Sequence, residues 1–264
     1  STADLLPILR ANLELLSKQN RQNLHKVILI FNSPASHRDR IEPGLIKDFG
    51  QHLPLQFVYY NFAQNTVMRA IDWGWTYCWM NWVLGLAASE TKHVLIHDLD
   101  AMLLDADMLE TRVAATRDAD APFSGSKYYN CGGIDKSDEL LTTFEMVCDV
   151  QLLRRQFKPI DCFNVPAKWK GRRIVFDTLL WPQTKVKRGA LLPIGLTEMV
   201  HPSQMISQYV AVKARAAYTP PETNNILMIP YFMELGGETA SLAEHQAALN
   251  ASDGHTVRCF GRSL

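Results

Sequence analysis

The chain has 264 residues, and its 27 basic and 27 acidic side chains give a formal net charge of zero, which offers no electrostatic case for nucleic-acid binding. Hydrophobic residues make up 47% and charged residues 20%, an ordinary globular balance, and no apolar run has the length of a membrane span. The five cysteines are scattered and form no Cys-x-x-Cys pair, so they indicate neither a zinc site nor a disulfide framework. We therefore expect a reducing, cytoplasmic compartment, with a lumenal fragment as the alternative.

Apolar periodicity predicts helices that alternate with strands along the first half of the chain. The expected helices are 1–19, 46–51, 66–89, 105–117 and 137–155, and the expected strands are 25–31, 55–60, 92–97, 121–129 and 190–194. A polar surface loop is expected over 158–171, and a short helix opens at Asp177. Alternating strands and helices favour an α/β fold with a mostly parallel central sheet, and the mixed later half predicts a smaller antiparallel portion. We expect a single domain over 1–264, with 205–264 as a C-terminal extension.

Two acids end the apolar run that begins at Lys92 and continues through His97. Side chains alternate along a strand, so Asp98 and Asp100 point the same way if the extended geometry persists. Paired carboxylates repel each other unless a cation or a proton lies between them, and the carboxyl end of a strand is where open α/β sheets bind ligands. The pair therefore suits a hard divalent ion such as Mg²⁺ or Mn²⁺. The alternative is a solvated acidic turn in which Asp98 caps the following segment.

Further motifs accompany the acid pair in a fixed order. They are the strand that ends in Asn32-Ser33, the segment from Asn61 to Arg69, the run Ile96-His97-Asp98-Leu99-Asp100-Ala101, the turn Cys131-Gly132-Gly133-Ile134, the run Phe176-Asp177-Thr178, and His201. Over residues 1 to 205 this set resembles the nucleotide-sugar-dependent glycosyltransferases of the GT-A fold. The chain departs from that family in two places, because Phe176 stands where the family has Glu and because we expect the family's first strand to be absent.

The resemblance implies a Rossmann-like GT-A domain and a hexosyltransferase activity that needs Mn²⁺ or Mg²⁺. The implied metal ligands are Asp98, Asp100 and His201, and the implied contacts to a UDP- or GDP-sugar donor are Asn32, Asn61, Arg69 and Asp98. The implied acceptor contacts are Gly132, Gly133 and Trp181, for a carbohydrate or another hydroxyl acceptor. Asp177 is implied as the general base, and a base on the far side from the leaving group implies inversion at the anomeric carbon.

Each of these residues also has a structural interpretation. Asp177 caps a helix, His201 is a hydrogen-bonded loop histidine before a proline, and Arg69 is a solvated helix residue. Asn32 ends its strand, Gly132-Gly133 forms a turn that needs positive φ, and Trp181 packs in the core. Two other functions stay open at this point: a nucleotidyltransferase of similar fold with an acid-pair metal site, and a non-catalytic carbohydrate-binding relative.

Overall fold

The computed structural model describes residues 5–128, 134, 136–186, 189–194, 198–201, 258–259 and 262–263. Its contacts divide the chain into two compact units. The first unit comprises Ser1–Leu16, Leu99–Leu103 and Val200–Leu264, and the second comprises Ser17–Asp98 and Leu104–Met199. The expectation of one domain over 1–264 stays a prediction.

In the first unit, helix α1 (Leu6–Ser17) confirms the helix expected near the N-terminus, since a leucine-rich stripe gives it one buried face. Ile8 and Leu13 on this face are almost completely buried. Strand β4 (Met102–Leu103) pairs with strand β10 (Met199–Val200) and is itself buried. A second pair joins β11 (Arg258–Cys259) to β12 (Arg262–Ser263) in antiparallel fashion.

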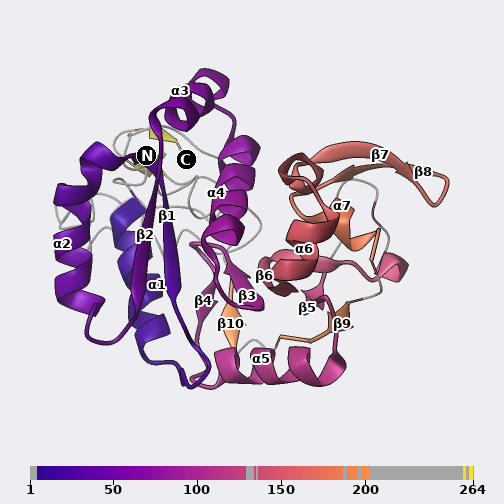
Figure 1. Cartoon of the computed structure of the whole chain (residues 1–264), viewed down its shortest axis with the longest axis horizontal. Helices are drawn as coiled ribbons and strands as arrows, with labels where there is room; N and C mark the ends of the chain where they lie inside the picture. The colour runs from indigo at the N-terminus through magenta and orange to yellow at the C-terminus, as the bar shows by residue number, and fades with distance from the viewer. Residues whose placement is uncertain are drawn as a thin grey trace. The chain divides into compact units, whose positions relative to one another are not determined.

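The second unit contains a parallel pair of strands, β1 (Val27–Pro34) and β2 (Leu55–Tyr60), in register from Val27 opposite Leu55 onward. A 3₁₀ turn, η2 (Ala35–His37), and helix α2 (Arg38–Phe49) connect them. Helix α2 contacts β2, and helix α4 (Gly74–Ala88) runs beside β1 (Figure 1). This is the β-α-β arrangement that the alternating pattern predicted.

The single long helix expected over 66–89 is wrong, because two helices occupy this segment. Helix α3 (Phe62–Ile71) ends where Asp72 takes a left-handed conformation with φ of 43°, and α4 begins at Gly74. A residue in this conformation stops a helix, and Trp73, in an extended conformation, then precedes the new helix as its N-cap. The continuous apolar periodicity concealed the break.

A four-stranded sheet in the order β3-β6-β5-β9 forms the centre of the second unit. Strands β3 (His93–His97) and β5 (Phe123–Lys127) both pair antiparallel with β6 (Leu141–Asp149), and β5 pairs parallel with β9 (Ala190–Leu191). The helix expected over 137–155 is therefore wrong except for its end, which forms α6 (Val150–Gln156). Strand β6 buries Met146, Val147 and Cys148 between two neighbouring strands, a long-range partnership that local periodicity does not contain.

The surface loop expected over 158–171 is also wrong in part. It contains a 3₁₀ turn, η4 (Pro159–Cys162), and strand β7 (Val165–Trp169), which forms an antiparallel hairpin with β8 (Arg172–Phe176). The remaining elements of this unit are α5 (Met108–Ala119), the 3₁₀ turn η3 (Lys136–Asp138) and the short helix α7 (Leu180–Gln183). The α/β class with parallel and antiparallel portions is confirmed.

Among the residues that the structure describes, no helix has the length and apolar character needed to cross a bilayer.

Candidate functional site

Asp100 and His201 meet within the first unit. The Asp100 side chain is 8% exposed and that of His201 is 17% exposed, and Asp100 Oδ1 lies 3.4 Å from His201 Nε2. Two donor atoms that share one ion at bond lengths of about 2.1 Å lie roughly 3 Å apart, so this separation suits a shared cation. The two residues are far apart in sequence, and the fold of the first unit brings them together.

Asp98 ends strand β3 in the second unit, where its backbone N–H donates to the Phe144 carbonyl at 3.0 Å. The chain connects Asp98 to Asp100 through a single residue, which by itself keeps the two carboxylates near each other. Asp100 and His201 are residues that could hold a metal ion, and Asp98 precedes Asp100 by two positions along the chain. Two carboxylates and one imidazole are a donor set for a divalent ion between hard and borderline, such as Mn²⁺.

Asp98 and Asp177 both lie close enough to Cys78 of α4 to act on its thiol. Burial raises the pKa of the Cys78 thiol to about 12, and the negative charges of Asp98 and Asp177 contribute to the rise. The thiol is free of any disulfide and stays protonated at neutral pH. The predicted donor ligand Asp98 and the predicted base Asp177 thus both act on the same thiol of the second unit.

Asp177 follows strand β8 and is held by a small buried network. Its Oδ1 accepts hydrogen bonds from Asn164 Nδ2 at 2.9 Å and from the Thr178 backbone N–H at 2.7 Å. The Thr178 hydroxyl donates in turn to Asn164 Oδ1 at 2.7 Å, so each member of the network has a partner. No residue that the structure describes donates a hydrogen bond to Asp177 Oδ2, which leaves this oxygen able to accept a proton.

Leu179, two residues after Asp177, has a φ of 64° although it is not glycine. A bulky side chain in this left-handed region is strained by about 1–3 kcal/mol, and such strain is concentrated at functional sites. The conformation is maintained because the Leu179 side chain is fully buried and its N–H donates to the Cys162 carbonyl at 2.9 Å. Because Leu179 precedes α7, the helix expected to open at Asp177 begins at Leu180.

The predicted donor contacts lie in the second unit at or beyond the carboxyl ends of β1 and β2. Asn32 is half-buried in β1, and Asn61 caps α3 by accepting a hydrogen bond from the Gln64 N–H at 2.8 Å. Arg69 is exposed in the last turn of α3. The cap gives Asn61 a structural role of its own.

Two buried polar atoms near Asn32 have no hydrogen-bond partner among the described residues. They are Ser33 Oγ in β1 and His37 Nδ1 in η2. A buried hydroxyl or imidazole nitrogen without a partner costs about 1–3 kcal/mol, so such groups are usually satisfied by protein groups, by ordered water or by a bound molecule. The carboxyl end of β1 therefore offers unsatisfied hydrogen-bonding capacity where the resemblance implies a nucleotide.

Of the three predicted acceptor contacts, Trp181 alone lies among the described residues. Trp181 packs against Phe176 with ring centroids 5.2 Å apart, and Lys185 Nζ lies 3.9 Å from the Trp181 ring centroid. Phe176 and Lys185 of the same unit therefore cover part of the Trp181 ring. Gly132 and Gly133 lie outside the described residues.

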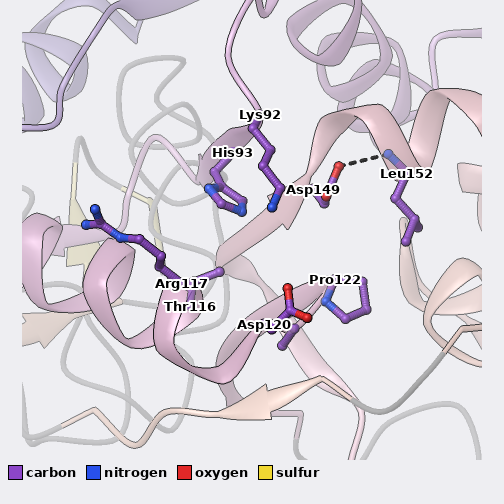
Figure 2. Close-up of a pocket in the computed structure, with 9 residues that line it drawn as sticks. Lys92, His93, Thr116, Arg117, Asp120, Pro122, Asp149 and Leu152 are labelled. Carbon is purple, nitrogen blue, oxygen red and sulfur yellow. Dashed lines mark hydrogen bonds between the residues drawn. The ribbon is translucent and has the colours of Figure 1, made fainter.

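A separate hollow of about 150 Å³ lies at the amino end of β3, at the other end of that strand from Asp98. Figure 2 shows this hollow, which is lined by Lys92, just before β3, by His93, the first residue of β3, and by the end of α5. Asp149 also lines it and caps α6 by accepting a hydrogen bond from the Leu152 N–H. None of the predicted site residues lines this hollow.

Three residues of the site region were not expected from the sequence. Cys78 is an apolar-type residue in an apolar helix, and Asn164 lies in a segment expected to be a loop, so neither carried a signal. Asn12 did carry one, since it interrupts the apolar face of α1 and its side chain donates to the carbonyls of Leu99 and Ala101.

No protein-family model matches the chain, and no curated protein matches it either. Solved structures do match it. A mannosyltransferase, PcManGT from Pyrobaculum calidifontis in complex with GDP-Man and Mn²⁺, is 13% identical over 94% of this chain and 72% of its own, with a TM-score of 0.48. A structure of residues 1–349 of TarS from S. aureus is 14% identical over 94% of this chain and 72% of its own, with a TM-score of 0.45.

A longer TarS structure matches with 13% identity over 94% of this chain and 44% of its own, with a TM-score of 0.44. At this level of similarity, the roles of individual residues rest on the chain's own chemistry.

Proposed function

We propose that this chain is a metal-dependent glycosyltransferase of hexosyltransferase type, which moves a sugar from a nucleotide-diphosphate donor to an acceptor hydroxyl with inversion. One observation carries the proposal: a nearly buried carboxylate, Asp100, faces the imidazole of His201 at 3.4 Å, two residues along the chain from Asp98, which follows β3. A buried acid and a histidine that converge beside a second acid suit a divalent cation better than they suit a solvated turn.

Asp98, Asp100 and His201 would hold the cation, Mn²⁺ or Mg²⁺. When bound, the ion neutralises the negative charge that builds on the departing nucleoside diphosphate. Asp98 is also proposed to contact the donor, since it continues the strand toward the ligand-binding edge of an α/β sheet.

The donor's nucleoside is proposed to lie at the carboxyl end of β1. Asn32 there presents a side-chain amide, and the unpartnered Ser33 Oγ and His37 Nδ1 would gain hydrogen bonds from a base or a ribose. Asn61 and Arg69 complete the proposed donor set on α3, with the guanidinium of Arg69 suited to phosphate oxygens.

Asp177 is proposed as the general base. Its Oδ1 is held by Asn164 and Thr178, and its Oδ2 would take the proton of the acceptor hydroxyl as that oxygen forms its bond to the anomeric carbon and the bond to the diphosphate breaks. Attack from the face opposite the leaving group inverts the configuration. Gly132, Gly133 and Trp181 remain the proposed acceptor contacts.

A melting experiment on the full chain tests the proposal. UDP- and GDP-sugars, GDP-mannose among them, should raise the melting temperature in the presence of Mn²⁺ or Mg²⁺ and should lose this effect when EDTA is added. Equal stabilisation in EDTA would contradict the metal dependence. Release of pyrophosphate from a nucleoside triphosphate and a sugar phosphate would instead establish a nucleotidyltransferase, and donor binding without any transfer or hydrolysis would establish a non-catalytic relative.

A further inference from the structure

Asn12 is a polar residue on the buried face of an apolar helix. Its neighbours on α1, Ile8, Leu9 and Leu13, form the core-facing stripe, and Asn12 itself is only 7% exposed. Burying a side-chain amide costs about 1–3 kcal/mol unless its hydrogen bonds are replaced, so a leucine or methionine would pack here at lower cost. The amide must therefore be explained by the bonds that it makes.

Those bonds go to one short stretch of the same unit. Asn12 Nδ2 donates to the Leu99 carbonyl and to the Ala101 carbonyl, each at 2.9 Å. An amide nitrogen has two hydrogens, so these two bonds use its full donor capacity. The two carbonyls belong to the residues on either side of Asp100, and α1 thereby holds the backbone on both sides of that aspartate.

We infer that Asn12 is a positioning residue that orients Asp100 for cation binding. Its amide nitrogen donates to the backbone on both sides of Asp100 and not to the carboxylate, and so the carboxylate stays directed at His201 and its oxygens stay available to an ion. This inference rests on the proposed function, because it requires Asp100 to be a cation ligand.

The energetic argument concerns preorganisation. Without the amide, the Leu99–Ala101 segment would have to be ordered when the ion binds. The conformational entropy lost in that ordering would make the ion's binding free energy less favourable. Residues that orient metal ligands typically contribute 10–100-fold to metal affinity. Packing of this segment does not need the amide, because Ala101, Met102 and Leu103 are already buried as apolar groups.

The test compares Mn²⁺ binding by the wild-type chain and by Asn12→Leu, measured by calorimetry with and without UDP or GDP. Asn12→Leu keeps an apolar side chain of similar size but has no N–H donor. Gln19→Leu is the matched control, since Gln19 is also a buried amide, 5% exposed, whose Nε2 donates to a backbone carbonyl, that of Asp105, at 2.7 Å.

Asn12→Leu should bind Mn²⁺ about 10–100-fold more weakly, and Gln19→Leu should bind it as the wild type does while losing comparable thermal stability. If Asn12→Leu does not fold, Asn12→Ser, which keeps a single shorter donor, should show a smaller loss of Mn²⁺ affinity. Wild-type affinity in the folded Asn12 variant, or an equal loss in Gln19→Leu, would overturn this inference alone. Absence of Mn²⁺ binding by the wild-type chain itself would overturn the proposed function as well.

Discussion

Each unit of the molecule contains an aspartate that is held by a buried asparagine, but the two asparagines bind different parts of their aspartates. In the first unit, Asn12 donates to the backbone carbonyls on both sides of Asp100 and leaves the carboxylate to His201. In the second unit, Asn164 donates directly to the carboxylate of Asp177. The same pair of residue types therefore produces two chemical environments.

The difference assigns the two acids to different tasks. A carboxylate whose oxygens are not used by the amide can bind a cation, as proposed for Asp100. A carboxylate with one oxygen fixed by an amide and a backbone N–H keeps its other oxygen oriented and able to accept a proton, as proposed for Asp177. If the comparison is correct, substitutions in the two regions will separate metal binding from turnover.

The largest effect is expected from Asp100→Asn. The substitution keeps the size of the side chain but removes its charge, so metal-dependent donor binding should be lost and turnover should fall at least about 10⁴-fold. Melting with and without Mn²⁺ and a transfer assay measure the two effects. Asp118→Asn, at an exposed acid on α5, is the control and should change neither. Retained metal dependence in Asp100→Asn would show that the cation is bound elsewhere.

Asp177→Asn should leave donor and metal binding intact while turnover falls by about 10²–10⁴-fold, because only the proton acceptor is lost. The readout is the turnover number measured beside the donor's dissociation constant. A variant with unchanged turnover would remove Asp177 as the base, and the capping interpretation of this residue would then stand.

A smaller effect is expected from Asn164→Ala. Asp177 and Thr178 would each lose a buried hydrogen-bond partner, so the free energy of unfolding should fall by about 1–3 kcal/mol and turnover by about tenfold. Thr184→Ala is the control, because it removes a hydrogen bond to the Trp181 carbonyl in the same unit without contacting Asp177. Equal turnover losses in both variants would indicate general destabilisation rather than orientation of the base.

A third carboxyl, that of Glu145 on β6, has no asparagine beside it and provides the smallest effect. It is fully buried with Arg112 Nε 3.1 Å from its Oε1, and burial raises its pKa to about 7 despite the lowering effect of Arg112. The folded state therefore binds a proton that the unfolded state releases near pH 4.5, so this contribution to stability is lost as the pH rises from 4.5 through 7.

We expect the wild-type chain to lose on the order of 2 kcal/mol of unfolding free energy between pH 5 and pH 8 through this group. Glu145→Gln, which is neutral at every pH, should flatten that part of the profile. Denaturant unfolding at several pH values measures it, and identical profiles for the two proteins would mean that Glu145 titrates normally.

Local sequence patterns predicted most of the first half of the fold. Strand β2 was expected over 55–60 and occupies those residues, because alternating apolar residues and flanking turns are local signals. The segment 141–149 was expected to be helical but forms β6, since its pairing with β3 and β5 is decided by residues 14 or more positions away. The break at Asp72 depends on a single backbone conformation, which apolar periodicity does not encode.

The candidate site, like the fold, contains residues that the sequence predicted and residues that it did not. Asp98, Asp100 and His201 were predicted together because metal-binding residue types at characteristic places are recognisable, and within the first unit Asp100 lies 3.4 Å from His201. Asn12 and Asn164 were not predicted, because each acts through hydrogen bonds to residues that only the fold brings near. Of these two, Asn12 was the more recognisable, as the one amide within the apolar face of an amphipathic helix.

The cation site is tested most directly by anomalous X-ray scattering at the manganese edge, from crystals of the chain grown with Mn²⁺ and UDP or GDP. The account predicts an anomalous peak within coordination distance of Asp100 and His201, in contact with the diphosphate. A diphosphate bound without such a peak, or a peak coordinated by other residues, would contradict it.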